Sequence, residues 1–346
     1  MTMIVNCYKC GMSRIGLELL CTKCGSPFRI YPNFRYRSGF KKNFPYIRNF
    51  ITLGECVTPV VEFGDTYLKL DYFQPTFSYK DRGSRILISF LNERINKNLP
   101  MSEDSSGNAG ASIAAYGARA GFSVNVFVPE DASGPKIDLI RSYAANIFKV
   151  KGDREAVRSK ALESNGFYVG HSVFPEFRDG IRSLAYEIYH QFHGQIPDNI
   201  FIPTSAGTLL LGLYEGLLHL KTSGLIDEIP HLIATQPELM SPIKSALSGL
   251  AYVPSIKRSI ADALVTEKPP LMDEIVRVLR SYGESISATE DEIISARNRL
   301  SSEGVMTEYS SAVAYACSLK YRKKGSRLII LTGNGLKNKM VQSAED

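Results

Sequence analysis

A lysine that could act as a nucleophile lies in the segment QPTFSYKDRGS, residues 74–84. Lys80 follows a Gln-Pro-Thr turn and precedes an apolar run, with Phe77 and Tyr79 beside it. These neighbours predict partial burial, which disfavours the charged ammonium and lowers the pKa of a lysine. A neutral amine can attack a carbonyl and form a Schiff base. A solvated lysine paired with Asp81 is the ordinary alternative, and this segment by itself leaves it open.

Three turns rich in small polar residues are candidate anion sites. They are SSGNAGAS (105–112), PTSAGTLL (203–210) and TGNGLK (332–337), and each follows an expected strand. A helix start leaves its first backbone N–H groups unpaired and carries a partial positive charge. Gly, Ser and Thr allow an anion to approach these groups, so the turn at 204–208 is a candidate phosphate site. One such turn usually only connects a strand to a helix, but three of them with Lys80 favour a ligand site.

Four cysteines have the spacing of a zinc ribbon. Cys7 and Cys10 form one CxxC pair, Cys21 and Cys24 form a second, and a glycine follows each pair. The glycines permit the tight turns that bring two thiolates to one metal. Because a tetrahedral four-thiolate site is closed, we expect a structural zinc; a metal-free remnant and an iron occupant are the alternatives. The pairs also predict a reducing, cytoplasmic location.

The remainder of the chain alternates strands and helices from about residue 60 onward. Expected strands are 66–73, 123–129, 146–152, 198–203, 231–238 and 327–335. Expected helices are 84–97, 107–121, 135–145, 153–166, 180–194, 209–224 and 289–304. This alternation predicts an α/β protein with open, mostly parallel sheets and helices on both faces. Ligands in such sheets bind beyond the carboxyl ends of the strands.

Composition excludes two classes of partner. The chain has 346 residues, 44% apolar and 22% charged, with a net charge of +6. The basic surplus is scattered, so we expect no nucleic-acid partner. No run approaches the ~18 apolar residues of a membrane helix, so we expect no membrane partner. The N-terminus lacks the apolar centre and cleavage site of a signal peptide.

The segments PTFSYKDRG, SSGNAGAS, TSAGT and TGNGLK, in this order, resemble the threonine synthase branch of the fold-type-II pyridoxal phosphate enzymes. The resemblance spans about residues 50–340, and a cysteine-rich N-terminal piece also recurs in that family. The lysine motif and TGNGLK are fairly specific to the branch, whereas dehydratases and cysteine-synthase relatives share SSGN. The resemblance implies a tryptophan-synthase-β-like fold: two open, twisted, mostly parallel sheets flanked by helices, plus a small N-terminal zinc ribbon.

The resemblance also implies how the chain divides. We expect a ribbon-like segment and linker at 1–45, a large cofactor-binding domain at 46–89 and 186–346, and a small mobile domain at 90–185. The small domain carries SSGN and should close over the substrate, because excluding water protects a reactive carbanion. A homodimer is expected from the family.

Site residues are implied position by position. Lys80 matches the Schiff-base lysine, which also acts as the general base, Asn108 the residue at the phenolic oxygen of pyridoxal 5'-phosphate, and Thr332 the hydroxyl at its pyridine nitrogen. The phosphate loop corresponds to Thr204, Ser205, Ala206, Gly207 and Thr208. The implied substrate-binding residues are Ser105, Ser106, Ser172, Arg178 and Arg182.

Several positions depart from the family pattern. The family usually has threonine at Ala109 and often asparagine in the loop that contains Ala206. In HSVFPEFRDGIRS (171–183), Phe177 stands where the family has arginine, Arg182 replaces lysine, and Arg178 lies one position late. Arginine binds phosphate through two hydrogen bonds and phenylalanine cannot. The candidates to compensate are Arg178, Arg182, Ser172 and Lys337.

Three functions follow as hypotheses. The first is a pyridoxal-phosphate-dependent carbon–oxygen lyase like threonine synthase, which converts O-phospho-L-homoserine and water to L-threonine and phosphate. The second keeps the cofactor but is a serine/threonine dehydratase or a β-replacement enzyme such as cysteate synthase, as the altered phosphate positions favour. The third is a zinc-ribbon interaction protein on a retired enzyme scaffold, against which Lys80, Asn108 and Thr332 argue.

Other residues have weaker claims. Glu308, in TEYSSA, resembles a family segment that lines the site, and Asp81 and Arg82 are candidates to tune it. His171 has no carboxylate or cysteine near it in the sequence, so we interpret it as structural. The segments 248–259 and 266–274 are expected to be loops of no clear role.

Overall fold

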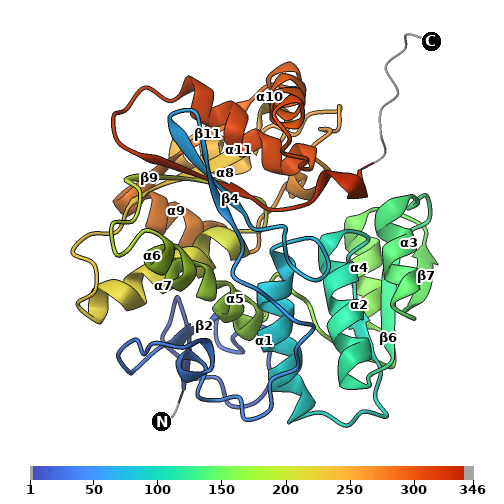
Figure 1. Cartoon of the computed structure of the whole chain (residues 1–346). Coiled ribbons are helices and arrows are strands. Elements are labelled where there is room, and N and C mark those ends of the chain that lie inside the picture. The colour runs from blue at the N-terminus through green and yellow to red at the C-terminus, as the bar shows by residue number, and fades with distance from the viewer. Residues whose placement is uncertain (1–2, 339–346) are drawn as a thin grey trace.

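The computed structural model describes residues 3–338. They form a small N-terminal piece and two α/β lobes (Figure 1). The strands are β1 (Ile4–Cys7), β2 (Phe28–Tyr31), β3 (Val60–Phe63), β4 (Thr66–Leu70), β5 (Met101–Glu103), β6 (Val124–Pro129), β7 (Asn146–Val150), β8 (Phe167–Tyr168), β9 (Asn199–Pro203), β10 (His231–Pro237), β11 (Gly283–Ala288) and β12 (Arg327–Leu331). The α-helices are α1 (Lys80–Asn92), α2 (Asn108–Ala120), α3 (Pro135–Ser142), α4 (Arg154–Leu162), α5 (Pro175–Ile181), α6 (Ser183–Gln191), α7 (Thr208–Thr222), α8 (Pro242–Leu247), α9 (Met272–Tyr282), α10 (Glu290–Ser302) and α11 (Tyr309–Lys320). Short 3-10 helices are η1 (Phe40–Asn43), η2 (Glu238–Met240), η3 (Asp262–Leu264) and η4 (Gly335–Lys337).

The larger sheet has six strands in the order β11-β10-β9-β12-β4-β3. All of its pairings are parallel except β3 with β4. Successive side chains of a strand point to opposite faces, so Ile200 and Ile202 of β9 join the core under α7 and α9. Phe201 points the other way and joins the core under α10 and α11. Helices therefore cover both faces of this sheet.

The smaller sheet has four parallel strands in the order β7-β6-β5-β8, within residues 101–168. The same alternation places Val126 of β6 in a core with α2 and α3 and Phe127 in a core with α4. The green lobe in Figure 1 contains this sheet. The two open, mostly parallel sheets flanked by helices that the sequence predicts are confirmed.

Local signals explain several helix starts. The Asp153 side chain accepts a hydrogen bond from Ala156 N at 2.9 Å and caps α4. Thr289 and Glu292 form a capping box at the start of α10. The helix expected at 180–194 is instead two helices, α5 and α6, which meet at Arg182.

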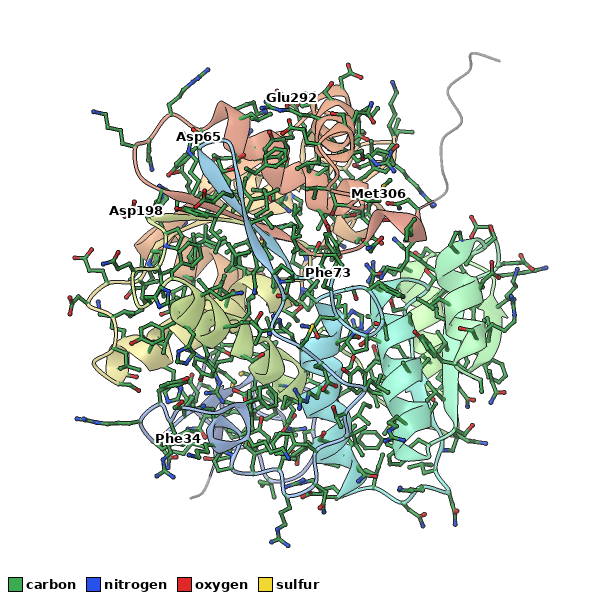
Figure 2. All side chains as sticks on the ribbon, in the orientation of Figure 1. Phe34, Asp65, Phe73, Asp198, Glu292 and Met306 are labelled. Carbon is green, nitrogen blue, oxygen red and sulfur yellow. The ribbon has the colours of Figure 1, made fainter. Side chains whose placement is uncertain are left out.

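Loops at the amino ends of the large sheet are tied together. Asp198, before β9 (Figure 2), accepts hydrogen bonds from Ser326 N at 2.7 Å and Ser326 Oγ at 2.9 Å. This pairing fixes the entries to β9 and β12, which are neighbours in the sheet. Within residues 3–338, no helix has the length and apolar character needed to span a bilayer.

Candidate active site

The carboxyl ends of both sheets open onto one cleft with a volume of about 1510 Å³. Its lining comes from the segments that follow β4, β5, β6, β7, β8, β9, β10 and β12. Ligands bind at this end of open sheets because strand-to-helix turns and helix N-termini gather there. The expected site residues that line the cleft are Lys80, Ser105, Ser106, Asn108, Ser172, Thr204, Ser205, Ala206, Gly207, Thr208 and Thr332.

Lys80 is the first residue of α1, so its amine projects from a helix start into the cleft. Nζ lies 4.8 Å from the ring centroid of Tyr79 and 5.7 Å from that of Phe177. The sequence suggested Phe77 as the second aromatic neighbour, but that side chain is 47% exposed. Phe177 takes this place instead because Gly83 lets the ring approach; a Cβ at Gly83 would lie 2.6 Å from it.

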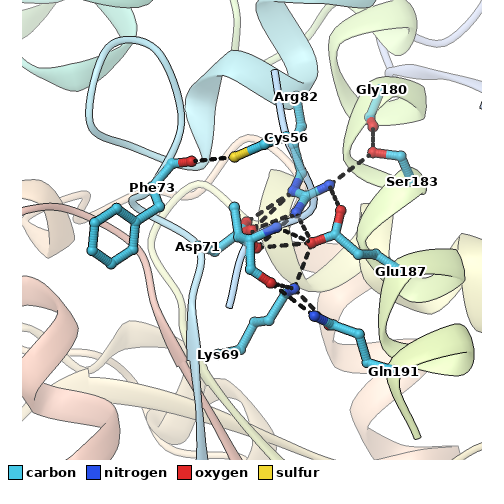
Figure 3. A network of polar contacts seen from close by, with 10 residues as sticks. Cys56, Lys69, Asp71, Phe73, Arg82, Gly180, Ser183, Glu187 and Gln191 are labelled. Carbon is cyan, nitrogen blue, oxygen red and sulfur yellow. Dashed lines mark hydrogen bonds and ion pairs between the residues drawn. The ribbon is translucent and has the colours of Figure 1, made fainter. Parts of the chain in front are cut away.

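A buried ion-pair network anchors the helix that carries Lys80 (Figure 3). Arg82 donates from Nη2 to Asp71, which follows β4, at 2.5 Å and to Glu187 of α6 at 3.0 Å. Lys69 of β4 also bonds Glu187 at 2.5 Å. Burial would raise the pKa of Glu187, but the charges of Arg82 and Lys69 hold it at about 2. Arg82 therefore fixes the start of α1 and does not face the cleft.

Asp81 lies on the buried side of the same helix start. Its carboxylate accepts hydrogen bonds from Thr76 N at 2.6 Å, Thr76 Oγ1 at 2.5 Å and Ser112 Oγ at 2.5 Å. Burial raises the pKa of Asp81 to about 6 in spite of these donors. The residue joins the lysine turn to α2 and is not the ion-pair partner of Lys80 that the sequence left open.

Asn108 is held by charged groups on both sides of its amide. Its Oδ1 accepts a hydrogen bond from Lys337 Nζ at 2.5 Å, and its Nδ2 donates to Glu308 at 2.9 Å. Glu308 also pairs with Lys136 at 3.1 Å. Burial lowers the pKa of Lys337 to about 8. Because a lysine only donates, it fixes the orientation of the amide, with the Nδ2 group as the available donor.

The turn between β9 and α7 has the features of an anion cradle. Gly207, with φ 100, precedes α7, whose N-terminus has no side-chain cap among the described residues. A Cβ at Gly207 would lie 2.4 Å from Ile275, so only glycine permits this close packing. Ser205 Oγ donates to Thr266 Oγ1 at 2.7 Å. The first N–H groups of α7 thus remain available to a phosphate.

Thr332, at the end of β12, can donate its hydroxyl proton into the cleft. Ser311 Oγ accepts hydrogen bonds from Thr332 N at 2.9 Å and Gly333 N at 3.0 Å, which occupies both lone pairs. Ser311 must then donate its own proton to Thr332 Oγ1, 3.0 Å away. The proton of Thr332 is left for a ligand acceptor.

The two arginines expected to bind substrate do not reach the cleft. Arg178 pairs with Glu215 at 2.9 Å and Glu274 at 2.7 Å, and is 2% exposed. Arg182 pairs with Asp179 at 2.7 Å and is 1% exposed. Both guanidinium groups compensate buried carboxylates, and removing either would leave an unpaired charge. Of the expected substrate-binding residues, the structure brings together only Ser105, Ser106 and Ser172.

Two features of the cleft were missed from the sequence. His171 has a carboxylate partner after all: its Nδ1 lies 2.6 Å from Glu103 Oε1. The two residues are far apart in sequence, and only the pairing of β5 with β8 brings them together. The loops interpreted as having no role also line the cleft, through 255–259 and 266–268. The residue types around His171 and in these loops did not indicate either feature.

The four cysteines meet in the N-terminal piece. Sulfur–sulfur distances are 3.5 Å for Cys7–Cys24, 3.6 Å for Cys10–Cys21 and 3.5 Å for Cys10–Cys24. Tetrahedral zinc with Zn–S bonds of about 2.3 Å needs sulfurs about 3.8 Å apart, so the thiol set fits such a metal. Gly11 and Gly25, with φ 73 and 69, form the turns after each pair.

The class of enzyme indicated by the fold and the cleft is also found when the sequence is compared with known proteins. The family model for pyridoxal-phosphate dependent enzymes matches residues 51–333. The chain belongs to this family, in its fold-type-II group. The resemblance to threonine synthases is confirmed by curated relatives with that name. The threonine synthase of Methanocaldococcus jannaschii is 30% identical over 291 residues, 79% of this chain and 71% of the relative. That of Methanosarcina acetivorans is 26% identical over 324 residues, 88% and 76% of the two chains.

Similar solved structures have other activities. An L-serine ammonia-lyase from Rhizomucor miehei superposes with a TM-score of 0.72 at 17% identity, covering 83% of this chain and 95% of that one. Serine racemase from Dictyostelium discoideum gives 0.67 at 25% identity, covering 81% and 92%. The first likeness, at its low identity, shows the shared fold alone.

The residues in the cleft fit pyridoxal phosphate. An amine, an oriented amide donor, a free hydroxyl proton and an uncapped helix start all line the same cavity. They match the aldehyde, phenolic oxygen, pyridine nitrogen and phosphate of the cofactor in chemical type. Lys80, Asn108, Thr332 and the turn 204–208 are therefore the groups that would hold it.

Proposed function

We propose that this chain is a pyridoxal-phosphate-dependent lyase that acts on the side chain of an amino-acid substrate. The observation that carries the proposal is the convergence of Lys80, Asn108, Thr332 and the 204–208 turn on one cleft. These residues come from four separate strand ends, so their meeting is a property of the fold. A protein that had lost its enzyme activity would not need to keep the Lys80 amine, the Asn108 amide donor and an uncapped helix start in one cleft.

The chain's own residues divide the work. When bound, the cofactor withdraws electrons from the substrate α-carbon. Lys80 would supply the amine that holds the cofactor aldehyde, and its free amine would take the α-proton. Asn108, oriented by Lys337, would donate to the cofactor oxygen. Thr332 would donate to the ring nitrogen without supplying a negative charge, which would favour elimination and replacement over transamination.

The first candidate reaction is the conversion of O-phospho-L-homoserine and water to L-threonine and phosphate. Its support is the name of the curated relatives, at 26% and 30% identity over most of the chain. Ser105, Ser106 and Ser172 line the cleft and are proposed to bind this substrate. Ser105 and Ser106 precede α2, whose N-terminus suits the substrate carboxylate.

The second candidate is dehydration of a hydroxy amino acid or replacement of a β-substituent. The specific observation that favours it is the use of Arg178 and Arg182 in buried ion pairs, while the Phe177 ring packs beside Lys80. Neither arginine can bind a substrate phosphate from its present position. A substrate with an uncharged leaving group needs no such ligand.

Two assays on the cofactor-loaded full chain separate the candidates. Phosphate release with threonine formation from O-phospho-L-homoserine supports the first, and 2-oxobutyrate from L-threonine supports the second. Lys80→Ala is the control and should abolish either activity. Turnover that survives this substitution, or failure of the wild type to bind pyridoxal phosphate, would contradict the proposed function.

Further proposals follow from the sequence and the family. We propose one structural zinc on Cys7, Cys10, Cys21 and Cys24, a mobile small domain at 90–185, and a ribbon segment and linker at 1–45 packed on the large domain of 46–89 and 186–346. The homodimer and the cytoplasmic location stay predictions. The small-molecule partner is an amino acid.

A further inference from the structure

A chain of three side chains lies in the wall of the cleft, outside the cofactor residues. Glu103 Oε1 lies 2.6 Å from His171 Nδ1, and His171 Nε2 lies 3.2 Å from Ser172 Oγ. Glu103 is fully buried and His171 is 6% exposed. His171 and Ser172 both line the cleft.

Sheet topology places these groups together. β5 and β8 are parallel neighbours, with Ser102 paired to Tyr168, so their carboxyl ends lie side by side. Glu103 ends β5, and His171 lies in the turn that follows β8. Val169 N donates to Ser102 O at 2.9 Å and continues the pairing up to that turn. The contact is thus built by two strand ends of the small lobe.

The numbers of donors and acceptors determine which nitrogen of His171 faces Glu103 as a donor. A carboxylate only accepts, so the proton of this pair lies on His171 Nδ1. Glu103 Oε2 is buried and has no partner among the described residues, so His171 is the one side chain that compensates the carboxylate there. Nε2 is then held facing Ser172, and Glu103 stabilises the imidazole when Nε2 also carries a proton, as the carboxylate of a hydrolase triad does.

These three side chains lie close to Lys80. The His171 ring centroid is 5.7 Å from that of Phe177, at an interplanar angle of 64°. Lys80 Nζ is 5.7 Å from the same Phe177 ring. Phe177 therefore packs near both the amine and the imidazole, and Lys80, His171 and Ser172 line the same cleft.

We propose that Glu103, His171 and Ser172 form a proton relay that protonates an oxygen leaving group on the substrate side chain. The proposal rests on the proposed function and deepens it: the substrate class is a hydroxy amino acid whose hydroxyl leaves as water. Phosphate departs as a stable anion and needs no such donor, whereas hydroxide is a poor leaving group without a proton. Ser172 contacts the substrate, His171 supplies Ser172 with a proton, and Glu103 is a positioning residue for His171.

The step balances in atoms and charge. Lys80 takes the α-proton. The electron pair of the Cα–H bond becomes the Cα–Cβ double bond as the Cβ–O bond breaks. The departing oxygen takes the proton of Ser172, and Ser172 takes one from Nε2 of the protonated imidazole. Water leaves, Lys80 returns its proton to solvent, and His171 regains one from solvent.

Paired substrates test the relay in the cofactor-loaded full chain. L-serine loses hydroxide and needs the relay, whereas β-chloro-L-alanine loses chloride and does not. His171→Asn and Ser172→Ala should lower 2-oxoacid formation from L-serine by about 10²-fold or more. Turnover of β-chloro-L-alanine by His171→Asn should stay within about threefold. His193→Asn, at an exposed loop histidine, is the matched control and should change neither rate.

Two further readouts make the test decisive. Exchange of the α-proton of L-alanine in heavy water measures Lys80 without any leaving group and should be unchanged in His171→Asn and His193→Asn. Glu103→Gln can donate to Nδ1 and so reverse the tautomer, which nitrogen NMR of the cofactor-free protein detects at His171. Equal loss with both leaving groups in His171→Asn, or no loss with L-serine, would overturn the relay, as would a wild type that eliminates only chloride. Absence of alanine exchange in the wild type would instead refute the proposed function.

Discussion

At the scale of single residues, local sequence predicted which side chains face the cleft better than which partners they have. Lys80 was singled out by its aromatic neighbours, and Asn108 and Thr332 by their strand-end turns of small polar residues together with the family resemblance. The partners of Arg178 and His171 were not found, because they come from distant elements that only the folded chain brings together. Helix spacing cannot show whether an arginine faces a ligand or a buried carboxylate.

Asp81 makes stability depend on pH in a defined direction. Its pKa is raised from 3.8 to about 6 by burial, so the folded state binds its proton more tightly than the unfolded state. The resulting stabilisation is complete below about pH 3.8 and is lost as the pH rises through about 6. The shift of about 2 units corresponds to a loss of about 3 kcal/mol.

The variant Asp81→Asn isolates this effect. We expect the thermal midpoint of the variant, relative to wild type, to rise by several degrees between pH 4 and pH 7. Asp138→Asn, at a carboxylate whose side chain is 68% exposed in its pair with Arg141, should show no such trend. A constant difference between Asp81→Asn and wild type across this range would contradict the buried-carboxylate interpretation.

At the scale of elements, α5 connects the N-terminal piece to the lysine. Glu176 bonds Arg14 at 2.8 Å, and the next residue, Phe177, packs beside Lys80. Arg178 shares Glu215 with Arg29 of β2. The sequence did not predict α5 as a separate helix, because its seven residues are mostly charged or small and its burial depends on these ion pairs.

Removing one partner of the buried pair should be costly. Arg14 and Glu176 side chains are 2% and 0% exposed, so Arg14→Ala leaves an uncompensated buried carboxylate. We expect a loss of about 3–5 kcal/mol in the free energy of unfolding, measured by urea titration. Arg141→Ala removes an exposed pair of equal length, 2.8 Å, and should cost less than about 1 kcal/mol. Equal effects of the two substitutions would show that the N-terminal piece is not anchored this way.

At the scale of the whole molecule, three units meet: the N-terminal piece with its four cysteines, the four-stranded sheet and the six-stranded sheet (Figure 1). The alternation of strands and helices predicted both sheets, and β9 and β12 contain the continuous apolar runs 200–203 and 328–331 that are typical of buried parallel strands. The edge strand β11, with sequence GESISA, carried no such signal. Strand order and the meeting of both sheets at one cleft came only from the structure.

The N-terminal unit should hold one metal per chain. Metal analysis of the full protein is expected to give one zinc, and Cys21→Ala, at a buried ligand, should release it. Cys56→Ser, at an exposed cysteine outside the cluster, should retain the metal. A wild-type chain free of zinc after growth in zinc-containing medium, or a Cys21→Ala chain that keeps it, would exclude the four-thiolate site.

The central claim is that the amine at position 80 binds the cofactor covalently, and borohydride reduction measures this directly. The full chain is saturated with pyridoxal phosphate, reduced, digested and analysed by mass spectrometry. The account predicts that the reduced cofactor is attached to the peptide containing Lys80, and that Lys337, in the same cleft, stays unmodified. Attachment to another lysine, or no attachment at all, would contradict it.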